Sequence, residues 1–402
     1  MNKLVLVRRL LAGRPLQNLL AVFVMSCCVA MTICILLLSA GLHSSLISAG
    51  EPFPMLLGAK GSPNQLVLNS VFLKDQPVGN INYNQLEKLR QNKNIDMVIP
   101  LGFGDNYKGF RIVGTEPTVF ELPKHLGSKD KWLNIAQGQK FKDSGEAVIG
   151  AEVAKRTGLK VGDSFSSVHG VVVNANAEGH KEKYKVTGIL YPVQGPYDSA
   201  VLVTMESIWS QHNHHSMAES GETSQKKEVT AAVIYPKSYA ASLQLFAFYS
   251  KDRDVQMIFP AKIIIQLFAL MGDAEKLLRF FSFAVLALSM LIIGCTLYWF
   301  VLGSLHQQAV MRALGASVQQ VTAIYFRLGI TLVSCGLILG VLAGHGLYKL
   351  LSYLLQHNAG LHMPHMLLST EAFIAAIILF FGAICSYIPA YLSGHRDITE
   401  TL

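Results

Sequence analysis

The sequence predicts a membrane α-helical protein with four transmembrane helices and one large α/β domain outside the membrane. Hydrophobic residues make up 51% of the 402-residue chain and charged residues only 15%, a balance that indicates a membrane protein rather than a soluble enzyme. The apolar residues gather in four runs, and a polar block, residues 43–260, separates the first run from the second. Each run can cross a hydrocarbon core about 30 Å thick, which takes roughly 20 residues of helix.

The first 18 residues predict an amphipathic helix on the cytoplasmic membrane surface, because leucines recur at helical spacing among basic residues and no acid occurs. A basic start before an apolar run also resembles a signal peptide. Residues 19–42, however, are longer than the apolar part of a signal peptide and lack a clear cleavage site. We therefore expect a retained first membrane helix with a cytoplasmic N-terminus. The basic residues are Lys3, Arg8, Arg9 and Arg14.

The polar block 43–260 then lies outside, which in a Gram-negative cell means the periplasm. Its pattern is α/β: short β-branched runs between Gly, Asn and Asp turns predict strands, and two segments have helix signals. Asn84 and Glu87 predict a helix over 84–91, and Gly158 is expected to end a helix over 151–157. All six cysteines lie in the apolar runs, so no disulfide framework is expected in this domain. The expected strands are 96–101, 110–114 and 147–149.

The second apolar run is expected to form one long helix with the residues before it. Residues 261–303 show helical spacing with no breaker except Gly272, and some forty helical residues span roughly 60 Å, twice the bilayer core. We therefore expect a stalk that projects into the periplasm and continues as the second membrane helix. The remaining segments are expected to be a third membrane helix (321–350), a short periplasmic loop (351–370), a fourth membrane helix (371–393) and a cytoplasmic tail (394–402).

The polar link between the second and third runs, residues 304–320, reads SLHQQAVMRALGASVQQ. A link this short predicts a turn and a short helix on the membrane surface. Arg312 lies near its centre and could pair with acidic groups of a cytosolic partner. Gly315 can end the helix, while Ala313 and Ala316 permit close approach. The plainer interpretation is that many cytoplasmic loops contain an arginine and a glycine.

Residues 312–317, RALGAS, resemble the cytoplasmic loop of ABC-transporter permeases in the FtsX/MacB/LolCE superfamily. Three phrases in the polar block, 145–168, 184–192 and 198–209, follow the order of strands and helices in a MacB-type periplasmic domain. The resemblance implies the mechanotransmission class, in which this loop is the coupling helix on the ATPase. The family often has Glu-Ile-Gly where this chain has residues 307–309, QQA. The implied coupling residues are Gln307, Gln308, Met311, Arg312, Ala313, Leu314, Gly315 and Ala316.

The chain has no phosphate-binding G-x-x-x-x-G-K-[ST] run, so ATP hydrolysis requires a separate subunit. The resemblance implies a dimer of cytosolic ATPases that holds ATP and Mg²⁺, and a second permease subunit, with a homodimer favoured over a heterodimer. It also implies work in the periplasm: lipoprotein extraction, driving an efflux assembly, or envelope signalling, with an adaptor or lipoprotein as partner. Nucleic acid is not expected, because no dense Lys/Arg patch with aromatics occurs.

Histidines in two polar insertions suggest a different function class, a membrane-anchored periplasmic protein that binds or senses zinc. Imidazole is a good zinc ligand, but the plainer interpretation is a solvated loop rich in histidine. A further histidine, His345, is the one basic or acidic residue in the apolar stretch 328–348. Such residues are candidates for function, although a hydrogen bond from the histidine to a neighbouring carbonyl would also explain its presence there. The candidate zinc ligands are His212, His214, His215, His169 and His180.

Overall fold

The computed structural model describes the chain except residues 1–2, 171–178, 211–226, 360–361, 365–368 and 395–402. The chain forms two compact units, and each is described by itself. The membrane unit comprises Met1–Leu42, Met271–Leu354 and Met363–Leu402, and the domain unit comprises His43–Leu270 and Leu355–His362.

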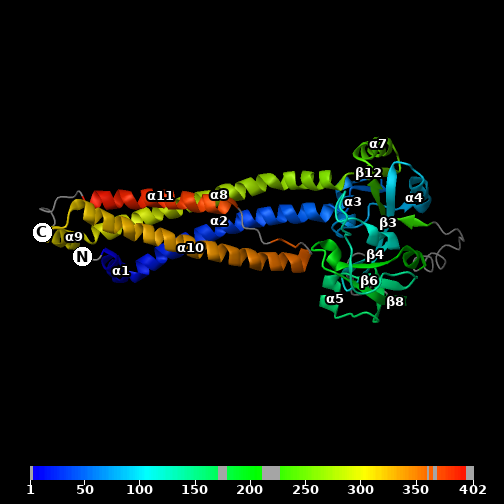
Figure 1. The fold of residues 1–402 in the computed structure, drawn as a ribbon, viewed down its shortest axis with the longest axis horizontal. Helices are drawn as coiled ribbons and strands as arrows, with labels where there is room; N and C mark the ends of the chain where they lie inside the picture. The colour runs from blue at the N-terminus through cyan, green and yellow to red at the C-terminus, as the bar shows by residue number, and fades with distance from the viewer. Residues whose placement is uncertain (1–2, 171–178, 211–226, 360–361, 365–368, 395–402) are drawn as a thin grey trace. The chain divides into compact units, whose positions relative to one another are not determined.

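Helices make up the membrane unit, and among the described residues four of them are long and apolar enough to span a bilayer, as predicted. The candidate spans are Pro15–Gly50, Lys276–Leu302, Val318–Gln356 and Ser369–Leu392. Large apolar side chains such as Phe280, Trp299 and Phe373 are exposed along them, as lipid-facing positions should be. The helices are α1 (Lys3–Gly13), α2 (Pro15–Gly50), α8 (Pro260–Leu302), α9 (Leu305–Ala313), α10 (Val318–Ala359) and α11 (Ser369–Gly394) (Figure 1).

Helix α8 is one continuous helix of 43 residues, about 65 Å long, so the predicted joining of stalk and second span is confirmed. Two other helices continue beyond their apolar runs. Helix α2 reaches Gly50 instead of residue 42, because no breaker occurs before Pro52. Helix α10 reaches Ala359 instead of residue 350, so much of the expected 351–370 loop is helical.

Helix α10 packs closely against α2 along a row of glycines spaced four residues apart. A Cβ added at Gly340, for example, would lie 2.5 Å from the Val29 Cβ and 2.9 Å from the Ser26 carbonyl oxygen. Small residues at this spacing let two membrane helices approach closely, which gains van der Waals contact that lipid does not supply. The contacting pairs are Gly336 with Met25, Gly340 with Val29, and Gly344 with Ile33.

A mixed β-sheet forms the centre of the domain unit, with strand order β12-β1-β11-β3-β4-β9-β6-β8-β5, and β7 pairs with β3 and β8. The pairs β4/β9 and β6/β8 are parallel and the other pairs of this sheet are antiparallel. The strands β2 and β10 form a separate pair. The strands are β1 (Met55–Ala59), β2 (Ile81–Asn82), β3 (Ile95–Tyr107), β4 (Phe110–Thr115), β5 (Ile135–Gly138), β6 (Glu146–Ile149), β7 (Ser164–His169), β8 (Gly179–Leu190), β9 (Ala200–Thr204), β10 (Glu228–Val229), β11 (Ala231–Pro236) and β12 (Val255–Ile258).

Short helices cover the sheet, and local signals explain two of them. Helix α5 ends at Thr157, and Gly158 follows in the left-handed conformation with φ 75°, as predicted. Helix α4 begins one residue earlier than predicted, because Asn82 rather than Asn84 is its N-cap: the Asn82 side chain accepts the Asn84 N–H at 2.9 Å. The short helices are α3 (Pro63–Ser70), α4 (Tyr83–Arg90), α5 (Ala151–Thr157) and α7 (Tyr239–Tyr249), with 3₁₀ turns η1 (Pro117–Glu121) and η2 (Pro196–Ser199).

The two strands at one edge of the sheet are connected directly to the two long helices. Strand β1 begins five residues after the last residue of α2, and only Phe259 separates β12 from α8. The strands β1 and β12 pair with each other, Leu57 opposite Met257. Beside this edge, α2 and α8 pack together: the rings of His43 and Phe268 meet edge to face with centroids 4.9 Å apart.

Candidate functional site

Helix α9, between the second and third candidate spans, is the site that the sequence singled out. Gly315 ends it with φ 94°, and the amides of Gly315 and Ala316 donate back to carbonyls of the last turn at 2.9 and 3.0 Å. Such bonds satisfy carbonyls that a helix end leaves open. Ser317 and Gln320 then exchange side-chain and backbone hydrogen bonds at 3.2 and 3.3 Å, a capping box that starts α10. Both ends of the link are therefore fixed by local chemistry.

One side of α9 is held inside the membrane unit by a buried hydrogen-bond network, here called the α9 network (Val301, Ser304, Gln308 and Tyr325). Gln308 is 4% exposed, and its Nε2 donates to the Val301 carbonyl at 3.0 Å and to the Ser304 Oγ at 3.1 Å. The Ser304 hydroxyl also lies 2.8 Å from the Tyr325 hydroxyl of α10. The network therefore joins α9 to the end of α8 and to α10.

Gln308, one of the coupling residues that the resemblance implies, is buried on the inner side of α9. Its amide faces inward because the last carbonyls of α8 need donors, and Ala309 beside it is also buried. Met311 and Arg312 are half-buried. Arg312 takes part in an interaction within the chain, and its pairing with acidic groups of a partner stays a prediction.

The opposite side of α9, here called the outer face, is His306, Gln307, Val310, Ala313 and Leu314, all of which are exposed. Val310 is 43% exposed and Leu314 83%. His306, Val310 and Leu314 follow one another at four-residue intervals, so they share one side of the helix. Apolar side chains at this spacing are the anchors by which a helix lies in a groove of a partner. His306 and Val310 were not predicted, although their four-residue spacing from Leu314 was a usable signal.

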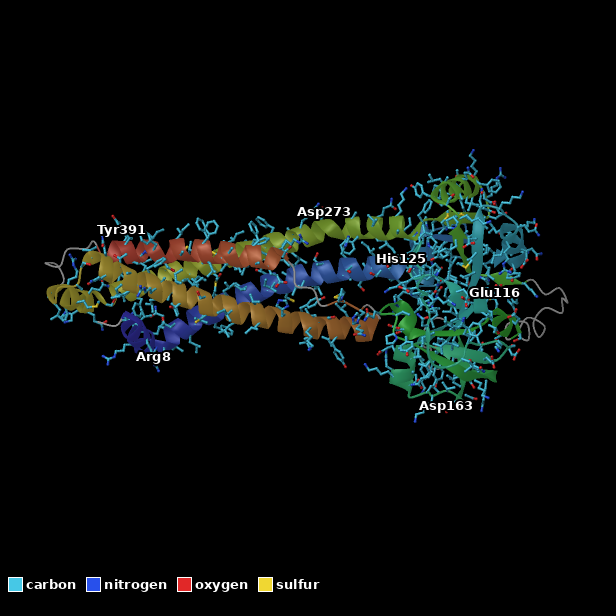
Figure 2. The ribbon with its side chains drawn as sticks, in the orientation of Figure 1. Arg8, Glu116, His125, Asp163, Asp273 and Tyr391 are labelled. Carbon is cyan, nitrogen blue, oxygen red and sulfur yellow. The ribbon has the colours of Figure 1, made fainter. Side chains whose placement is uncertain are left out.

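The charge around α9 is basic. Residues 304–320 contain one arginine and no acid, and Arg8 and Arg9 are exposed on α1. Figure 2 marks Arg8 on α1 and Tyr391 on α11 toward the same end of the helices as α9 in Figure 1. This end of the membrane unit therefore offers apolar anchors with positive charge nearby, which suits a partner surface or a lipid headgroup layer with acidic groups.

The candidate zinc ligands are only partly within the described residues. His212, His214 and His215 lie outside them. His169 ends β7 and His180 is the second residue of β8, and these strands pair antiparallel with Val168 opposite Gly179. In the described part of the chain, no group of three or more His, Cys, Asp or Glu side chains is placed to hold a metal ion.

His345 has a carboxylate partner rather than the carbonyl that the sequence suggested. Its Nε2 lies 3.0 Å from an Oε2 of Glu371, in the first turn of α11. The Glu371 side chain is 12% exposed and that of His345 31%. The partly buried pair therefore joins α10 to the first turn of α11, and polar groups in a membrane-spanning helix are expected to be paired in this way.

The fold and site define a class: a multi-span helical membrane protein with an α/β domain inserted between the first and second spans. The family model described as MacB-like periplasmic core domain matches residues 19–240, and the one described as FtsX-like permease C-terminal matches residues 279–398. No curated protein matches the chain.

Two solved structures are similar to part of the chain. The periplasmic region of MacB from Actinobacillus actinomycetemcomitans has 9% identity and a TM-score of 0.33 over 54% of this chain and 94% of that one. The extracellular domain of the noncanonic ABC-type transporter YknZ from Gram-positive bacteria has 12% identity and a TM-score of 0.29 over 51% of this chain and 98% of that one.

The chain belongs to the MacB/FtsX family of ABC-transporter permeases, since the family model covers more than half of it. It is therefore an inner-membrane protein with a periplasmic domain.

Proposed function

We propose that this chain is the permease subunit of an ABC transporter that couples ATP hydrolysis by a separate cytosolic ATPase to work in the periplasm. The work is lipoprotein extraction, driving an efflux assembly, or envelope signalling. The single observation that carries the proposal is the two-sidedness of α9. Its inner side is bonded to α8 and α10, while its outer face exposes Val310 and Leu314.

The outer face is the proposed docking surface for the ATPase. Leu314 and Val310 are apolar and exposed, so burying them in a groove of a partner is favourable by about 25 cal/mol per Å² of apolar surface. The ATPase subunits would hold ATP and Mg²⁺, since this chain has no G-x-x-x-x-G-K-[ST] run. Closure of two ATPases on ATP would then move two copies of α9, one from each permease of a homodimer.

The α9 network supports transmission of that movement. Because Gln308 and Ser304 bond α9 to α8 and α10, a displacement of α9 displaces these helices instead of bending a loop. Helix α8 then continues without interruption to Pro260. It enters the domain through β12, and α2 enters through the paired strand β1. The proposed output is therefore a movement applied at one edge of the periplasmic sheet.

This function requires that α1, α9 and the C-terminal segment lie in the cytoplasm. The basic residues of α1 and of the α9 link support this orientation, since positively charged segments stay on the cytoplasmic side. Four crossings then return the chain to the side on which it starts.

The proposal is tested by isolating the tagged full-length chain from its native membranes in a mild detergent. We expect an ATPase with a Walker A motif to co-purify, identified by mass spectrometry, with ATP hydrolysis sensitive to vanadate. The Leu314→Glu and Val310→Glu variants should no longer co-purify with the ATPase, because each would bury a charge at the docking surface. Arg312→Glu should reduce the amount of ATPase that co-purifies.

Leu126→Glu is the matched control, because Leu126 is an exposed leucine of the periplasmic domain, 56% exposed. This variant should retain the ATPase. The proposal fails if the wild-type chain brings down no such ATPase, or if Leu314→Glu retains it as fully as Leu126→Glu does.

A further inference from the structure

The chain between α1 and α2 forms a fixed bend, here called the α1 elbow (residues 11–18). Pro15 starts α2; it has no N–H to donate, and it disfavours helical geometry at the residue before it, so the helix breaks at Arg14. Across the break, the buried Asn18 side chain donates its Nδ2 to the Leu11 carbonyl at 3.0 Å. The Asn18 backbone N–H donates to the Arg14 carbonyl at 3.2 Å. The elbow is therefore held by its own hydrogen bonds.

The Arg14 side chain extends from this elbow to the last turn of α8. Its Nη2 donates to the Gly303 carbonyl at 3.2 Å, and its guanidinium carbon lies 5.3 Å from the centre of the Phe300 ring. A cation is favourable at a helix C-terminus, where the carbonyls carry partial negative charge, and favourable over an aromatic ring. Gly303 leaves room for this contact, because a Cβ there would overlap the Arg14 guanidinium.

The turn that Arg14 contacts is the same turn that anchors α9. Val301 and Ser304 of the α9 network flank Gly303, and the Phe300 ring meets the Tyr325 ring with centroids 6.2 Å apart. The network holds this turn from the inside, toward α8 and α10. Arg14 holds it from the other direction, toward α1 and α2. The Arg14 hydrogen bond therefore joins the elbow at the start of α2 to this turn.

We propose that Arg14 is a positioning residue that clamps the base of α9 to the α1 elbow, so that movement of α9 is passed to α2 as well as to α8 and α10. The inference rests on the proposed function for its consequence, but the clamp itself can be tested without the ATPase. It gives α1 a mechanical role: with Arg8 and Arg9 exposed on the same helix, α1 ties the first membrane helix to the coupling element at the membrane surface.

The clamp is tested by hydrogen–deuterium exchange of the full-length chain in nanodiscs, followed by mass spectrometry. Arg14→Ala should speed exchange of the amides in residues 300–309 by roughly five- to tenfold, as loss of a charge-assisted hydrogen bond implies. Gly303→Ala should have the same effect by displacing Arg14, and the double variant should show no further increase, since both changes remove one interaction. Arg14→Lys keeps a cation that can donate to the same carbonyl, so it should restore most of the protection.

Arg9→Ala is the matched control, because it removes an exposed arginine of the same helix without touching Gly303. It should leave exchange in 300–309 as in the wild type. The clamp is refuted if Arg14→Ala leaves this exchange unchanged, or if Arg9→Ala raises it equally. Additive effects of Arg14→Ala and Gly303→Ala would also refute it.

The consequence is tested by repeating the exchange measurement on the complex of the chain with its co-purifying ATPase, with and without ATP and vanadate. In the wild type, nucleotide should change exchange in both α2 and α8. In Arg14→Ala, the ATPase should still co-purify and the response of α8 should remain, while the response at the start of α2, next to the elbow, should be reduced, because the middle of α2 still packs against α10. An unchanged response of α2 would overturn the inference. Absence of any ATPase from the wild-type preparation would overturn the proposed function instead and leave the clamp result standing.

Discussion

Replacing Leu314 with alanine removes three carbon atoms from a side chain that is 83% exposed at the end of α9. In the free chain these atoms have almost no packing partners, so we expect the stability of the fold to be unchanged. In a complex they would be buried, and each methylene equivalent contributes about 0.8 kcal/mol. The loss in binding is therefore about 2 kcal/mol, or roughly a 30-fold increase in the Kd for the ATPase.

The assay is binding of the purified ATPase to the full-length chain in nanodiscs, with thermal unfolding of the chain measured in parallel. Leu126→Ala, the same change at an exposed leucine of the periplasmic domain, should change neither quantity. A Kd for Leu314→Ala within twofold of the wild-type Kd would show that the outer face of α9 is not the docking surface. A large drop in the unfolding temperature would show that Leu314 packs within the chain after all.

Three further predictions follow from the structure. Gly340→Ala should destabilise the chain by about 1–3 kcal/mol, since its Cβ would press on α2. Gly346→Ala on the same helix is the control and should be neutral, because its Cβ would meet nothing within 4 Å. Equal shifts in the unfolding temperature of the two variants would contradict the close packing of α10 on α2. Hydrogen bonds from Lys131 and then Lys140 lower the pKa of Glu121 from 4.5 to about 2, so the stability it adds is present above pH 4.5 and lost as pH falls toward 2. Glu121→Gln should therefore flatten the acid unfolding curve in that window, and identical slopes would disprove it. Zinc titrated into the chain should give no saturable heat, because the histidines of the two insertions do not show a recognisable zinc-ligand spacing. A saturable signal that disappears when residues 211–228 are deleted would instead support the zinc-sensing alternative.

Much of the fold was predictable because its signals are local. Uncharged runs of sufficient length became the four candidate spans, and a Gly after a helical pattern became the left-handed C-cap at Gly158. The helices α2 and α10 extend beyond the membrane spans predicted at 19–42 and 321–350, because hydropathy marks where a helix leaves lipid and not where the helix stops. Those ends depend on breakers, such as Pro52 after α2.

The pairing of distant segments was not predictable in the same way. The parallel pair β4/β9 joins segments about ninety residues apart, with Arg111 opposite Ala200 and Thr115 opposite Thr204. His345 and Glu371 meet across two helices. A single sequence does not indicate which distant segments make such contacts, since each segment by itself is compatible with many neighbours.

For the candidate site, the sequence by itself determined that a short polar helix lies between two membrane helices and ends at Gly315. Its helical period also determined that His306, Val310 and Leu314 share a side. Only the tertiary structure decided that this side faces outward and that Gln308 faces inward, because α9 is too polar for burial to be predicted from hydropathy. The contact between Arg14 and Gly303 depended on the tertiary structure entirely, since 289 residues separate them and folding alone brings the elbow to the end of α8.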